Sequence, residues 1–149
     1  MAKLNNIGRI KTIKKAKELI ISISKKEKVR TTFLKKDEGR GGYNYGGSAA
    51  PDLIMLSPFR KCTDEDIKNG RNKFNRYVIG NKCLNPAECM LVAFFHELSH
   101  CKLNKDNPFD KGSRYPYELW TTMLGLEYAK EKYGMEISDE SIKWLGNYS

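Results

Sequence analysis

Apolar residues recur at helical spacing near the N-terminus. Four isoleucines within residues 9–24 (Ile10, Ile13, Ile20 and Ile23) lie three or seven residues apart, with lysines and one glutamate between them. Such spacing places side chains on one face of an α-helix. The pattern therefore predicts an amphipathic helix over 9–24 whose polar face is basic.

Short strand-like segments follow this helix. Residues 29–34 combine β-branched and aromatic side chains in alternation, and residues 52–57 form a short apolar run that ends before Pro58. Five glycines within residues 39–48 predict a turn or loop between these segments, and residues 76–80 are a weaker strand candidate. We expect a short antiparallel sheet.

The second half of the chain carries clear helix boundaries. Asn85 can cap a helix, Pro86 suits its first position, and Glu88 can reach back to the cap. These residues predict a helix from Pro86 to about Leu103.

Two further helices are predicted after a polar loop over 104–113. One begins at Pro116 and ends at Gly134, because glycine is the favoured residue just past a helix end. The other covers residues 138–147. With 149 residues and 40% hydrophobic side chains, the chain is expected to form a single α+β domain over 1–149.

Positive charge is concentrated in the first quarter of the chain. Residues 1–40 carry 13 Lys or Arg against four Asp or Glu, whereas residues 41–149 carry 14 of each, so the net charge of +9 lies entirely in the first part. The basic helical segment 1–27 and the basic residues 3–36 as a whole could contact nucleic acid. The alternative is a solvated helix face.

Membrane insertion and export are not expected. The longest apolar runs are far shorter than the ~20 residues that a membrane span requires, and no secretory signal is readable. The four cysteines form no CxxC pair, so we expect reduced thiols in the cytoplasm.

The predicted helix over 86–103 contains the sequence His96-Glu97-Leu-Ser-His100, which uses both histidines of the chain. Side chains four residues apart lie one turn apart on the same helix face, so both imidazoles can bind a single ion. Glu97 is displaced around the helix and suits the role of general base. This is the physical logic of the HExxH zinc motif.

A catalytic zinc site requires a third protein ligand, and no histidine remains. The acidic candidates are Asp106, Asp110, Glu118 and Glu127. The two aspartates belong to a polar loop, and Glu118 and Glu127 point in opposite directions because nine residues separate them. Glu118, near the start of its helix, is the preferred ligand.

Several polar residues near Glu118 could support the chemistry. Thr122, one turn later, is placed to form a hydrogen bond with a ligating imidazole, although it could equally bond its own backbone. The candidates for stabilising an oxyanion are Arg114, Tyr115, Tyr117, Tyr43 and Tyr45.

The combination of His96-Glu97-Leu-Ser-His100 with Tyr117-Glu118-Leu119 resembles the zincins whose third ligand is a glutamate, the gluzincins. Within that group the chain is most similar to small metallopeptidase domains of phages and mobile elements, such as the C-terminal domain of ArdC-type antirestriction proteins. The likeness covers roughly residues 43–130.

This resemblance implies a minimal zincin-like fold, in which a short antiparallel sheet with an edge strand covers the HExxH helix. It implies one Zn²⁺ ion held by His96, His100 and Glu118, with Glu97 as the general base for hydrolysis of peptide bonds. The family's edge strand, along which an extended peptide or protein substrate lies, corresponds here to Asp52, Leu53, Ile54, Met55 and Leu56. It also implies the cytoplasm of a bacterial host.

A second hypothesis belongs to a different class of function. The chain could be a nucleic-acid-associated accessory protein of a phage or mobile element, similar to antirestriction proteins, that binds through its basic N-terminus. Its zinc site would then be structural or vestigial.

Overall fold

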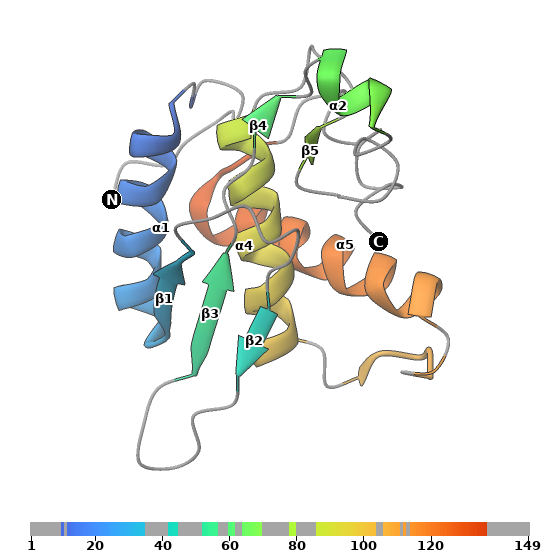
Figure 1. Cartoon of the computed structure of the whole chain (residues 1–149). Helices are drawn as coiled ribbons and strands as arrows, with labels where there is room; N and C mark the ends of the chain where they lie inside the picture. The colour runs from blue at the N-terminus through green and yellow to red at the C-terminus, as the bar shows by residue number, and fades with distance from the viewer. Residues whose placement is uncertain are drawn as a thin grey trace.

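The helix α4 (Pro86–Lys102) lies at the centre of the computed structural model (Figure 1). All of its residues from 87 to 99 are buried, as expected of a helix covered on every side. It contacts α1 (Ile13–Glu27), α5 (Arg114–Tyr133) and the strand β3 (Leu53–Leu56). The structure describes residues 10, 12–34, 42–44, 52–56, 60–61, 64–69, 78–79, 86–103, 106–110, 112 and 114–136.

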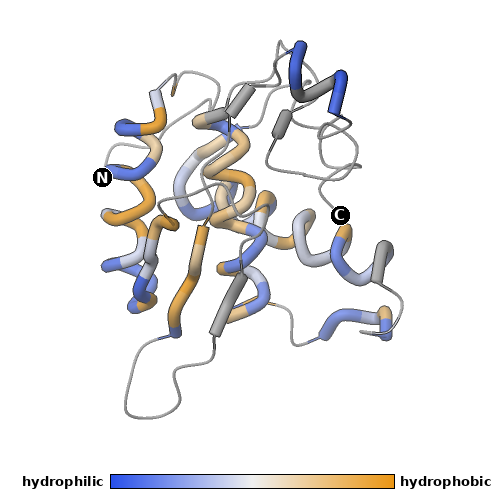
Figure 2. Tube along the Cα trace, in the orientation of Figure 1, coloured by the Kyte–Doolittle hydropathy of each residue, from blue (hydrophilic) through white to orange (hydrophobic). Residues whose placement is uncertain are grey.

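A three-stranded sheet covers one side of α4. Its order is β1 (Arg30–Phe33), β3, β2 (Gly42–Asn44), with β1 parallel and β2 antiparallel to β3. Ile54 and Leu56 of β3 are fully buried. Figure 2 shows the hydrophobic colour on β3 and again on α4 behind it. The α+β class is confirmed.

Two features of the predicted sheet are wrong. The sheet is mixed rather than antiparallel, because β1 runs parallel to β3 whereas β2 runs antiparallel to it. Since β2 pairs with the far side of β3 and not with β1, the residues Leu53, Ile54, Met55 and Leu56 form the central strand, with Asp52 just before it, and not an edge strand. A short apolar run suits a strand flanked on both sides. Within the described residues, the edges are β1 and β2.

A second, smaller sheet pairs β4 (Arg60–Lys61) with β5 (Val78–Ile79) in parallel. Strand β5 confirms the candidate over 76–80. The short helix α2 (Asp64–Lys68) lies between the two strands in the chain and was not predicted.

The helix α1 begins four residues later than the predicted helix over 9–24 and ends three residues after it. Thr12 caps its start by accepting a hydrogen bond from the backbone N–H of Lys15 at 3.2 Å. At its end Lys28 adopts a left-handed conformation, with φ of 58°. Ala16, Ile20 and Ile23 form its buried face.

The helix α5 begins two residues before the predicted Pro116 and ends at Tyr133, as predicted. Gly134, with φ of 66°, ends it, and its N–H donates to the carbonyl of Lys130 at 3.0 Å. The predicted helix over 138–147 lies outside the described residues. No helix of the described part is long and apolar enough to cross a membrane.

The backbones of α4 and α5 lie in close contact at Gly125. A Cβ atom added there would lie 2.8 Å from the carbonyl carbon of Phe95 and closer still to its oxygen, and 3.3 Å from the backbone nitrogen of His96. Any side chain larger than hydrogen would therefore push α5 away from the part of α4 that carries His96.

A buried carboxylate connects α1 to the far end of α5. Glu27, 5% exposed, accepts hydrogen bonds from the hydroxyls of Tyr128 (2.7 Å) and Tyr133, and from Nζ of Lys132 at 2.6 Å. Burial alone would raise the pKa of Glu27, but these three donors outweigh it and leave the pKa below its ordinary value. The ionised carboxylate therefore stabilises the packing of α1 on α5.

Replacing this carboxylate should cost stability in a pH-dependent way. Because the folded-state pKa of Glu27 is depressed, its contribution is present above the ordinary pKa of 4.5 and is lost as the pH falls below that value. We expect Glu27→Gln to lower the free energy of unfolding by about 1–3 kcal/mol at pH 7. The difference should shrink in urea titrations below pH 4.5. Glu131→Gln, at an exposed position of α5, is the control and should change stability little. If the loss of stability in Glu27→Gln did not vary with pH, the ionised carboxylate would not be its cause.

Candidate metal centre

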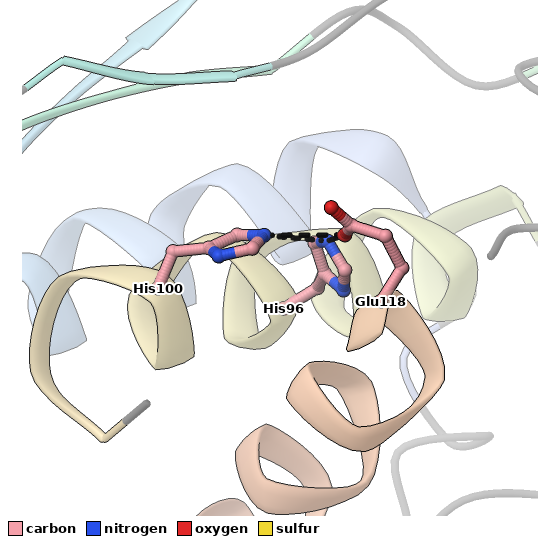
Figure 3. Close-up of side chains that lie close together, drawn as sticks. All are labelled: His96, His100 and Glu118. Carbon is pink, nitrogen blue, oxygen red and sulfur yellow. Dashed lines mark hydrogen bonds and ion pairs between the residues drawn. The ribbon is translucent and has the colours of Figure 1, made fainter. Parts of the chain in front are cut away.

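Three side chains from two helices converge between α4 and α5 (Figure 3). Nε2 of His96 lies 2.8 Å from Oε2 of Glu118, Nε2 of His100 lies 3.2 Å from the same oxygen, and the two ring nitrogens are 3.1 Å apart. His96 is buried, whereas the side chains of His100 and Glu118 are 18% and 27% exposed. The structure therefore brings together the three predicted ligands, with one side of the group accessible to solvent.

Protons alone cannot satisfy these three contacts. Each imidazole nitrogen is either a donor or an acceptor, and one N–H can point well at only one acceptor. In a triangle of two ring nitrogens and one carboxylate oxygen, at least one of the three contacts then joins two donors or two acceptors. A cation placed among the three atoms would be attractive to all of them, so this donor set fits a metal ion.

Thr122 fixes the orientation of His96. Its hydroxyl donates to the backbone carbonyl of Glu118 at 3.1 Å and lies 2.6 Å from Nδ1 of His96. Because the single hydroxyl proton is already used, Nδ1 of His96 must be the donor to Thr122. In the neutral ring this leaves a lone pair on Nε2, which faces His100 and Glu118.

The electrostatics of the site favour a charged carboxylate. Burial alone would raise the pKa of Glu118, but the adjacent rings of His100 and His96 outweigh it and hold the pKa well below its ordinary value. Glu118 is therefore in the anionic form that binds metals.

Glu97 is buried, at 6% exposure, beside His96 on α4. One turn later, Cys101 is half-buried, and its pKa rises to about 12 through desolvation and through the negative charges of Asp52 and Glu97. Asp52, just before β3, and Glu97 thus both lie near the Cys101 thiol. The Cys101 thiol stays protonated, and Cys101 does not belong to the metal-binding group.

The other acidic candidates are not part of this group. Asp106, Asp110 and Glu127 are exposed, and Glu118 is the acidic residue that lies with the two histidines. Among the aromatic candidates, the ring of Tyr117 lies 5.9 Å from that of His100, tilted by 30°.

Several remaining candidates cannot be placed by their side chains. Arg114 and Tyr115 belong to the first turn of α5 and Tyr43 to β2, but their side chains, and all of Tyr45, lie outside the described part. Sequence reasoning did not single out Asn107, whose side-chain amide donates to the carbonyl of Tyr117 at 3.4 Å and ties the preceding loop to α5. An asparagine in a polar loop gives no pattern that would predict this contact.

No family model, curated protein or solved structure matches this chain significantly. The interpretation of the site therefore depends on its own geometry.

Removing the Thr122 hydroxyl should weaken metal binding without removing a ligand. Thr122→Val keeps the side-chain shape but leaves Nδ1 of His96 without its acceptor, so we expect the affinity for a divalent metal to fall by about 10–100-fold. Competition with a chromophoric chelator measures this affinity. Thr122→Ser should bind nearly as tightly as the wild type.

The matched control for this experiment is Thr121→Val. Thr121 is equally buried, but its hydroxyl donates to the carbonyl of Tyr117 on its own helix. If Thr121→Val weakened metal binding as much as Thr122→Val, the hydrogen bond to His96 would have no special role.

Proposed function

We propose that this chain is a zinc-dependent metallopeptidase with a minimal zincin-like fold. The observation that carries the proposal is the convergence of His96, His100 and Glu118, with separations of 2.8–3.2 Å between their ligand atoms. Ligands bound at ~2.0–2.1 Å in a tetrahedral site lie about 3.3 Å apart, so only small adjustments would be required.

The composition of the group supports zinc in a catalytic rather than a structural role. Two imidazoles and one carboxylate form a typical set of three protein ligands for catalytic zinc, whereas structural zinc sites are closed by four protein ligands, mostly Cys and His. Within the described residues the group has three members, and two of them are partly exposed. A fourth position open to solvent is what hydrolysis requires.

A bound zinc ion would polarise the substrate carbonyl and make water more acidic. In the proposed reaction, Glu97 accepts a proton from the attacking water and delivers it to the leaving amine. Its position directly after His96 on α4 supports this role, because a general base must lie close to the water that it deprotonates. Tyr117, beside His100, is the best-placed described candidate for donating a hydrogen bond to the oxyanion.

An extended substrate would bind at an edge of the sheet. Since β3 is paired on both sides, we assign this role to β2, which has an unpaired edge within the described residues and contacts α4. Backbone hydrogen bonds along such an edge would hold a peptide in extended form.

Metal analysis tests the ligand set. Wild-type protein purified without chelator should contain about one zinc ion, Glu118→Ala should lose it, and Glu97→Gln should retain it. Glu127→Ala, on the exposed side of the same helix, is the matched control and should also retain it. A folded wild type that refuses added zinc would overturn the proposal.

Catalysis is tested on the same proteins with a library of unstructured peptides and mass spectrometry of the new peptide ends. The zinc-loaded wild type should cleave, and the zinc-loaded Glu97→Gln variant should lose nearly all activity. If the loaded wild type generated no more peptide ends than Glu97→Gln, the alternative of a non-catalytic zinc site would be favoured.

A further inference from the structure

The solvent-facing side of α1 carries a dense group of basic residues that the proposed active site does not use. Six exposed side chains on this side of α1 and just after it are basic; we call them the α1 basic face. They are Lys14, Lys15, Lys25, Lys26, Lys28 and Arg30.

Within α1, basic side chains outnumber acidic ones. Glu18 is the one exposed acidic residue of α1. The other acidic residue of the helix, Glu27, is buried and already paired with Lys132 and two tyrosine hydroxyls. Its charge is therefore compensated inside the protein, so the exposed side of α1 carries an excess of positive charge.

The spacing of the lysines forms a regular pattern. Lys14 and Lys25, like Lys15 and Lys26, are 11 residues apart, which corresponds to about three helical turns and ~16 Å along the axis. The first and the last turn of α1 thus each carry a pair of ammonium groups, and the two pairs lie on the same side of the helix. This span is comparable with the ~12 Å width of the DNA major groove, so the two pairs could contact phosphates on both of its sides.

An anionic membrane surface fits this face less well. A helix that lies in a membrane interface inserts its apolar side, but the apolar side of α1 (Ala16, Ile20 and Ile23) is fully buried against the core. Ile21, 44% exposed, is the one large apolar side chain that α1 exposes among its described residues. The face therefore offers charge without an apolar anchor.

We propose that the α1 basic face binds the phosphodiester backbone of nucleic acid. Figure 1 places α1 on the outside of the molecule, with its buried side toward the sheet and α4, whereas the metal centre lies between α4 and α5. A nucleic acid on this face would leave the metal centre uncovered. Binding is therefore independent of the proposed peptidase activity.

The first test measures the affinity for a fluorescein-labelled 20-base-pair duplex, and for one of its strands, by anisotropy at several salt concentrations. The triple variant Lys14→Gln/Lys15→Gln/Lys25→Gln should bind roughly tenfold or more weakly. The slope of log affinity against log salt should become shallower by about 0.9 for each duplex phosphate that the variant no longer neutralises. The matched control is Lys68→Gln/Lys102→Gln/Lys130→Gln, which removes three exposed lysines elsewhere and should change both quantities little.

A gain of affinity provides the second test, because misfolding cannot produce it. Glu18 lies among the lysines of the α1 basic face, so Glu18→Gln should tighten binding, while Glu131→Gln on α5 should not. The metal-free protein and Glu97→Gln should bind as tightly as the wild type, so failure of the peptidase proposal would leave this result unchanged.

Three outcomes would overturn the proposal. These are no salt-dependent binding by the wild type, an equal loss of affinity in the two triple variants, or binding to vesicles of anionic phospholipid at a salt concentration where neither nucleic acid binds. The last outcome would assign the face to a membrane surface instead.

Discussion

The close contact of α4 with α5 at Gly125 is the constraint on which the candidate site depends. The glycine lets the backbone of α5 approach the peptide unit between Phe95 and His96, and a side chain there would collide with it. Gly125 lies seven residues after Glu118, which is two turns of helix and nearly the same face. The contact that holds the helices together therefore also sets the distance between the carboxylate and the two imidazoles.

The hydrogen bonds of Thr122 fix the orientation of the ligand side chains, in addition to their distance. The same hydroxyl binds the carbonyl of Glu118 and the ring of His96, so one side chain couples the third ligand to the first. A network of buried polar groups is stable when every member has a hydrogen-bond or ionic partner. Here the partners come from two helices and from the ion that we propose. On the far side, Glu27 ties α5 to α1, so both ends of the helix are fixed against α4 and its neighbours.

Local patterns predicted much of this structure. The helices around His96 and Glu118 follow from apolar spacing, proline and glycine, and helical rotation alone separated Glu118 from Glu127. The sheet was predicted less well, because alternation along one strand does not encode which strands are its neighbours or in which direction they run. The contacts of Glu27 with residues more than 100 positions away had no local pattern either.

In the site that we propose, two imidazoles and one carboxylate of this chain hold a zinc ion. X-ray absorption spectroscopy at the zinc edge of the loaded protein tests this ligand set most directly, because it distinguishes nitrogen and oxygen ligands from sulfur. We expect two imidazoles with one or two oxygen ligands and no sulfur, and loss of this spectrum in Glu118→Ala. A spectrum dominated by sulfur would assign zinc to the cysteines and contradict the proposed ligand set.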